Sequence, residues 1–106
     1  MKIFTDKEQN LNVYIFSNDH LPAHVHIFKG SKNEANIYNV KINIGGENER
    51  PSVVKAHESI KRSDINAALE LVFEKQEIFL KEWVRIHGIQ KLENQRRGTR
   101  RSNRKG

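Results

Sequence analysis

The sequence predicts an α+β fold, in which a three- or four-stranded antiparallel sheet is packed by one long C-terminal helix. Two observations lead to this expectation. Apolar and polar residues alternate at a period of two through much of residues 1–44, whereas apolar residues follow helical spacing from Ser63 to Ile86. A run of strands followed by a helix is the pattern of an α+β domain.

The first two predicted strands are residues 1–5 and 11–16, joined by a polar turn. In the second of them, Leu11, Val13 and Ile15 fall on one face. We expect that face to be buried.

Two further strands follow a loop that contains Pro22, which disfavours helix at the residue before it. They are residues 24–29 and 34–44, the second with a bend, a bulge or a break at Asn39. Residues 47–62 are a mostly polar connection, and we expect its pair of valines to contact the core.

The helix is predicted to begin at Ser63, a good N-cap, and to end before Gly88. Its length is roughly 24 residues, or about 36 Å. The apolar stripe that would cover the sheet comprises Ile65, Leu69, Val72, Phe79, Leu80, Trp83 and Ile86. Residues 1–88 therefore form a single domain.

The net charge of +6 is concentrated at the end of the chain. Seven of the 19 Lys and Arg residues and one of the 13 acidic residues lie in residues 89–106, so the rest of the chain is neutral. Few apolar residues occur in this segment, and we expect a basic, disordered tail. Its spaced cations could bind RNA or DNA phosphates, or an acidic partner. The candidate binding residues are Arg96, Arg97, Arg100, Arg101, Arg104 and Lys105.

Several classes of function are excluded or disfavoured. No cysteine is present, so thiol catalysis, disulfides and thiolate metal sites are ruled out. Phosphate-binding glycine motifs and a nucleophile elbow are also missing. No apolar run approaches the ~20 residues that span a bilayer, and the first residues do not resemble a signal peptide. We expect a cytoplasmic protein without a membrane partner.

The stretch N-D-H-L-P-A-H-V-H from Asn18 to His26 is the strongest candidate site. It holds three of the five histidines of the chain, together with Asp19. Because His24 and His26 are two apart in a predicted strand, they project from the same face. His20 lies upstream, across the loop.

Three chemistries need such a cluster. His24 and His26 could hold a divalent metal, and no other cofactor is expected. They could instead be an acid–base pair for RNA cleavage or another hydrolysis, with His20 and Asp19 in support. They could also recognise bases or phosphates. The structural alternative is that the imidazoles only fix the Pro22 loop.

The motif D-H-L-P-A-H-V-H, together with the late L-K-E-W-V-R-I-H-G, resembles a small bacterial family catalogued as domain of unknown function 4160. The resemblance places Pro22 and Trp83 among the structural signature positions, beside Asp19 and the histidines. It implies a compact cytoplasmic protein encoded beside a second small protein in a toxin–antitoxin-type pair. The adjacent gene product is then the expected partner. The alternative function is a histidine-dependent ribonuclease or metal-dependent hydrolase that uses His20, His24 and His26.

Two residues depart from the family pattern. Ala23 replaces a second proline, and Gln76 replaces a histidine that many members carry in the helix. If that histidine were a ligand or base, this chain would lack it. At the end of the helix, His87 is expected to interact with the negative end of the helix dipole, and Trp83 to pack in the core or to wall the histidine site.

Overall fold

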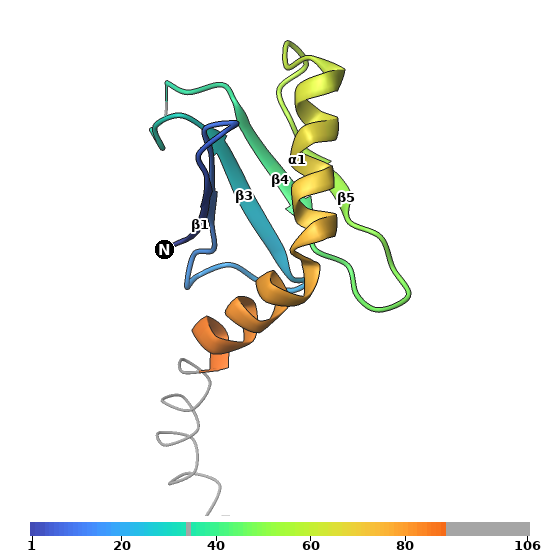
Figure 1. Cartoon of the computed structure of the whole chain (residues 1–106). Helices are drawn as coiled ribbons and strands as arrows, with labels where there is room; N and C mark the ends of the chain where they lie inside the picture. Colours follow the sequence, from blue (N-terminus) through green and yellow to red (C-terminus); the bar gives the residue numbers. More distant parts are fainter. Residues whose placement is uncertain (34, 89–106) are drawn as a thin grey trace, which may run out of the picture.

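The computed structural model describes residues 1–33 and 35–88, which form an antiparallel sheet followed by helical segments (Figure 1). The five strands are β1 (Lys2–Asp6), β2 (Leu11–Tyr14), β3 (His24–Lys29), β4 (Asn39–Asn43) and β5 (Ser52–Lys55). Each strand pairs antiparallel with the next, so the sheet is a meander with the order β1-β2-β3-β4-β5. The predicted α+β class is confirmed.

The sheet has one strand more than the three or four that were predicted. The additional strand is β5, which lies in the segment interpreted from sequence as a polar connection, and it pairs with β4 through Ile42 and Val53. The expectation that its valines contact the core is wrong, since Val53 is 37% exposed and Val54 is 48% exposed. Because all four residues of β5 are exposed, its sequence shows no alternation of apolar and polar residues. Its extended backbone is stabilised by pairing with β4.

One face of the sheet is buried and carries the core. Leu11, Val13 and Ile15 lie on it with exposures of 1% or less, as predicted. The neighbouring strand β3 adds the buried residues Val25 and Ile27, and Ile27 is directly opposite Val13. α1 (Arg62–Glu74) runs along this sheet near β4 and β5 (Figure 1).

The predicted single long helix is wrong, because the helix is broken at Lys75. α1 ends at Glu74, and a second helical segment covers residues 76–88. The backbone of Lys75 has φ −106° and ψ 16°, outside the helical values. Ser63 is not the N-cap either: the cap is Lys61, which makes no side-chain capping hydrogen bond.

Gln76 explains where the second segment starts. Its side-chain amide donates to the carbonyl oxygens of Ile44 at 2.8 Å and Glu49 at 2.9 Å. These bonds fix the start of the second segment at the end of β4, and the segment then turns away from α1 (Figure 1). The new direction buries Phe79 against Phe4, with ring centroids 5.9 Å apart, and carries the helix across the end of the sheet.

Within residues 1–33 and 35–88, no helix has the length and apolar character required to cross a bilayer. The basic tail and its arginines, which were predicted to bind a partner or nucleic acid, lie outside the described residues.

Candidate functional site

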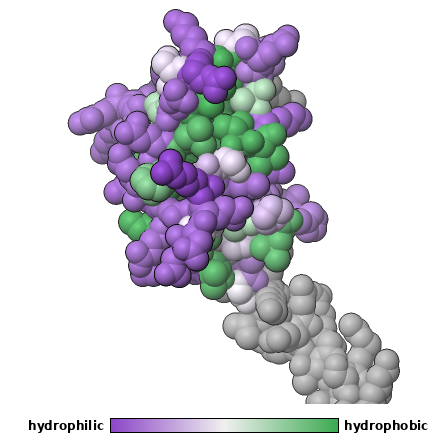
Figure 2. Space-filling view, turned by 90° about the vertical axis from the view of Figure 1, so that its right-hand side faces the viewer, coloured by the Kyte–Doolittle hydropathy of each residue, from purple (hydrophilic) through white to green (hydrophobic). Residues whose placement is uncertain are grey.

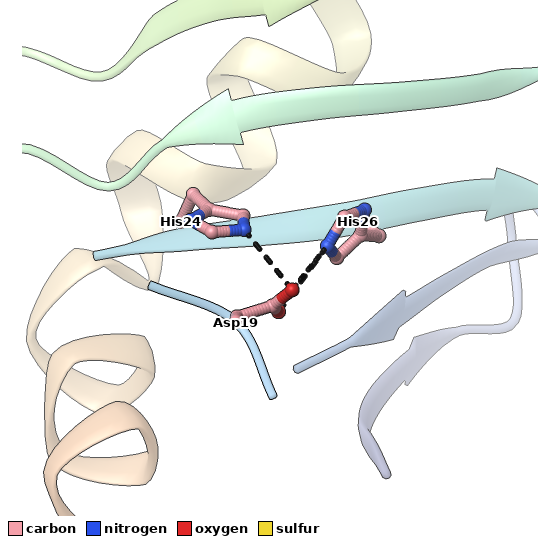
Figure 3. A group of neighbouring side chains, drawn as sticks. All are labelled: Asp19, His24 and His26. Carbon is pink, nitrogen blue, oxygen red and sulfur yellow. Dashed lines mark hydrogen bonds and ion pairs between the residues drawn. The ribbon is translucent and has the colours of Figure 1, made fainter. Parts of the chain in front are cut away.

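β3 places His24 and His26 on one face of the sheet, as the alternation of side chains along a strand predicts. This is the face opposite α1: in Figure 3 the two imidazoles lie on the near side of β3 and the helices pass behind it. His24 is 3% exposed and is the only polar residue buried in the described part of the chain. His26 is half-buried.

The loop between β2 and β3 folds back over β3 and supplies the carboxylate. Two hydrogen bonds close this turn: the N–H of Asp19 donates to the carbonyl of Phe16 at 3.0 Å, and the N–H of Phe16 donates to Oδ2 of Asp19 at 2.9 Å. The second bond fixes the side chain as well as the backbone. Asp19 is therefore held with its carboxylate directed at the two imidazoles (Figure 3).

The three side chains form a compact cluster, called here the Asp19–His24–His26 cluster. Nε2 of His24 lies 3.4 Å from Oδ1 of Asp19. Nε2 of His26 lies 3.3 Å from Oδ1 and 3.2 Å from Oδ2 of the same carboxylate. One nitrogen or oxygen of each residue lies within 4.8 Å of the others.

The orientation of His24 decides what its Nε2 presents to the cluster. Its Nδ1 lies 2.9 Å from the carbonyl oxygen of Pro22, which can only accept, so Nδ1 carries a proton and donates. In the neutral ring, Nε2 then has no hydrogen, and its lone pair faces the carboxylate of Asp19. Two electron-pair donors at this distance repel unless a cation, either a proton or a metal ion, lies between them.

The electrostatics keep Asp19 ionised and His26 neutral near pH 7. Burial alone would raise the pKa of the Asp19 carboxyl, but the N–H of Phe16 and the nearby His26 and His24 outweigh burial and lower it. Burial lowers the pKa of His26, an effect that the carboxylate of Asp19 offsets only in part. A carboxylate and a neutral imidazole are the forms that coordinate metals.

The second helical segment supports the cluster from the end of the sheet. The ring of Trp83 lies 5.3 Å from that of His24 and stacks on His87 at 3.8 Å. Trp83 is thus both a core residue and a wall of the site, as the sequence allowed. The nitrogens of His87 lie 3.0 Å from the carbonyl of Trp83 and 3.1 Å from the backbone carbonyl of Asp19. His87 therefore links the helix to the loop that carries the carboxylate.

Of the histidines predicted to act together, the structure brings two into the cluster. His20 is exposed and lines a hollow of about 270 Å³ that His24 also lines, but it is not a member of the cluster. Pro22 contributes its carbonyl oxygen. Gln76, which stands where relatives were expected to have a histidine, binds the carbonyls of Ile44 and Glu49 instead, so the cluster is formed without that position.

Two contributors were missed from sequence. His87 is four residues after Trp83, and this helical spacing could have revealed that both rings share one face. Lys41 lines the hollow beside His24 and a second hollow, of about 500 Å³, beside His26. Lys41 is directly opposite His26 in the sheet, a register that the sequence of β4 alone does not specify.

The side chains of the cluster, whose donor atoms lie within 4.8 Å of one another, are those that bind divalent transition metals. Ligand atoms about 2.1 Å from a tetrahedral ion are separated by roughly 3.4 Å, close to the 3.2–3.4 Å between the Asp19 oxygens and the two Nε2 atoms. Two imidazoles and one carboxylate suit zinc, iron or nickel and leave coordination positions open. The hydrogen bonds from His24 to Pro22 and from Phe16 to Asp19 are outer-shell contacts of the kind that orient metal ligands.

Comparison with protein families gives a match that covers most of the chain. A sequence model of the family described as domain of unknown function (DUF4160) matches residues 10–84, which include the whole cluster. Neither the curated proteins nor the solved structures contain a match.

Proposed function

Because the chain belongs to the family described as domain of unknown function (DUF4160), whose description assigns no activity, we propose a function from the geometry of the cluster: the protein is a metal-dependent hydrolase. The observation that carries the proposal is that the Nε2 atoms of His24 and His26 converge on the carboxylate of Asp19, at 3.4 Å and 3.2 Å. A metal ion bound by His24, His26 and Asp19 would be coordinated by all three groups.

The assigned roles follow from the contacts. Asp19, His24 and His26 hold the ion, and the hydrogen bonds to Phe16 and Pro22 orient two of these ligands. When bound, the metal supplies Lewis acidity and lowers the pKa of a coordinated water. Substrate would reach it from the hollow of about 270 Å³ lined by His24. A metal-free acid–base pair is less well supported, because His24 is buried and both Nε2 atoms face the carboxylate.

Metal binding is the direct test. Tag-free protein dialysed against Zn²⁺, Ni²⁺ or Mn²⁺ is expected to retain one equivalent of at least one of these ions, measured by elemental analysis. Hydrolysis of a chromogenic phosphodiester or carboxylic ester should then require the ion and stop on chelation. A chain that retains none of the three ions would overturn the proposal.

A second candidate function is that of a binding component in a two-gene, toxin–antitoxin-like module, as the resemblance implied. It is favoured by apolar side chains exposed on the helices, where Phe73 is 57% and Val84 is 65% exposed. Figure 2 shows apolar surface on the face of the molecule that carries α1 and β5. Exposed apolar patches mark contact surfaces for other proteins.

For this second function, co-expression with the product of the adjacent gene is expected to yield a complex that co-purifies. Phe73→Ser should weaken the complex at least tenfold, since an aromatic anchor of an interface contributes about 2 kcal/mol or more. Lys61→Ser, a change at an exposed residue just before α1, is the matched control. Separate elution of the two proteins would exclude the adjacent product as the partner. Expression of each gene alone and of both together would assign the toxin and antitoxin roles.

A further inference from the structure

The register of the sheet aligns four side chains across the face that carries the cluster. Tyr14 is directly opposite His26, His26 is opposite Lys41, and Lys41 is opposite Lys55. The row therefore crosses β2, β3, β4 and β5, with an irregularity in the β4–β5 pairing next to Lys41. With strands about 4.8 Å apart, it is roughly 14 Å long. It runs from an aromatic ring, past one proposed metal ligand, to two ammonium groups.

The two lysines at one end of the row are an unfavourable pair as they stand. Like charges directly opposite each other in a sheet are destabilising. Among the described residues, neither ammonium lies within ion-pair distance of a carboxylate, although other lysines of the chain do. An anion between Lys41 and Lys55 would replace this repulsion by two charge-assisted hydrogen bonds.

The hollows on both sides of Lys41 contain side chains that can bind a phosphate. One hollow is lined by Asn43 beside His24, and the other by Asn39 and Lys55 beside His26. Apart from Asp19, the residues that line the two hollows include no acid. A phosphate at the lysine pair would therefore meet cations and amides, and it would lie one strand away from a proposed metal ligand.

The opposite end of the row has a different chemistry. The rings of Tyr14 and Phe16 are stacked, with centroids 6.0 Å apart and planes 21° apart, and both are only half-buried. Phe16 also lies 4.7 Å from the ring of His26. The Lys32 ammonium lies 5.1 Å and 5.0 Å from the centroids of the two aromatic rings. Aromatic rings on a sheet face, with a cation beside them, are a platform on which nucleic-acid bases stack.

We propose that this face binds a single strand of nucleic acid, with one phosphate between Lys41 and Lys55 and a base on Tyr14 and Phe16. The row lies across the proposed metal centre, so a phosphodiester bound along it would pass over the Asp19–His24–His26 cluster. The inference deepens the proposed function, on which its catalytic part rests, by naming the substrate class. A duplex is excluded as the ligand because its paired bases cannot lie on the aromatic rings.

The test measures the affinity of the full chain for fluorescein-labelled single-stranded RNA and DNA, with a chelator present so that cleavage cannot interfere. The double variant Lys41→Gln/Lys55→Gln is expected to bind roughly fivefold more weakly at about 0.1 M salt, because contact with one phosphate is lost. The plot of log affinity against log salt should become shallower by about 0.7. Tyr14→Ala should weaken binding at least fivefold, since stacking on one base contributes about 1–3 kcal/mol.

Lys7→Gln/Lys61→Gln is the matched control, because it removes the same charge from exposed positions outside the row. Equal affinities of the two double variants would overturn the inference, since nonspecific attraction to the basic chain would then explain binding. Competition by a free mononucleotide as strong as that by the strand would also overturn it, in favour of a small phosphate ester. Metal binding is measured separately. If the protein binds no metal but still binds the strand through Lys41 and Lys55, the hydrolase proposal is rejected and the strand-binding proposal stands.

Discussion

Asp19→Asn is expected to weaken metal binding by about 100-fold or more, the largest effect predicted for the site. Loss of an outer-shell partner alone typically costs about 10–100-fold in metal affinity, and Asp19 is a proposed direct ligand. The substitution keeps the shape of the side chain, and its amide oxygen can still accept the N–H of Phe16, so the loop should remain closed. Isothermal titration with Zn²⁺, or with whichever ion the wild type retains, measures the change.

The control for this prediction is Asp64→Asn, which removes the same charge from a residue on α1 that pairs with Lys29 at 3.7 Å. Its metal affinity should equal that of the wild type. Urea unfolding of both variants without metal shows whether the fold survives. A folded Asp19→Asn variant with unchanged affinity would remove Asp19 from the metal site.

Gly45→Ala is expected to lower the free energy of unfolding by about 3 kcal/mol, the largest effect predicted for the fold. Gly45 has φ +77°, where a side chain costs about 1–2 kcal/mol. An added Cβ would overlap the carbonyl oxygen of Glu49 and lie 3.0 Å from backbone atoms of Arg50, and overpacking adds about 1–3 kcal/mol. Because the same Glu49 carbonyl accepts the Gln76 amide, the substitution also disturbs the start of the second helical segment. The melting temperature, measured by circular dichroism, should fall by roughly 15 °C.

The adjacent glycine provides the comparison. A Cβ added to Gly46 would meet nothing within 4 Å, and its φ lies outside the left-handed range. Gly46→Ala should therefore change stability by no more than about 0.5 kcal/mol. Equal melting temperatures for the two variants would show that the close approach at Gly45 does not control stability.

The alternation of apolar and polar residues predicts strands that have one buried face. In residues 11–16 the alternation of Leu11, Val13 and Ile15 reports burial on one side, and the structure confirms it. β5 gives no such pattern because it lies at the edge with both valines partly exposed. The helix break is similarly hidden: the apolar spacing continues through Lys75, and the break depends on two carbonyl groups in distant segments that bind Gln76.

For the candidate site, the sequence by itself determined that His24 and His26 share a face, since strand geometry requires it, and that a carboxylate lies nearby in the chain. Only the tertiary structure decided that Asp19 joins them and His20 does not, because that choice depends on the turn closed by Phe16. The tertiary structure likewise decided that Lys41 and Lys55 align with His26, and that His87 reaches the backbone of Asp19. Strand register and helix direction are set by contacts between segments far apart in the chain. The local sequence patterns that identify each strand and helix do not specify these contacts.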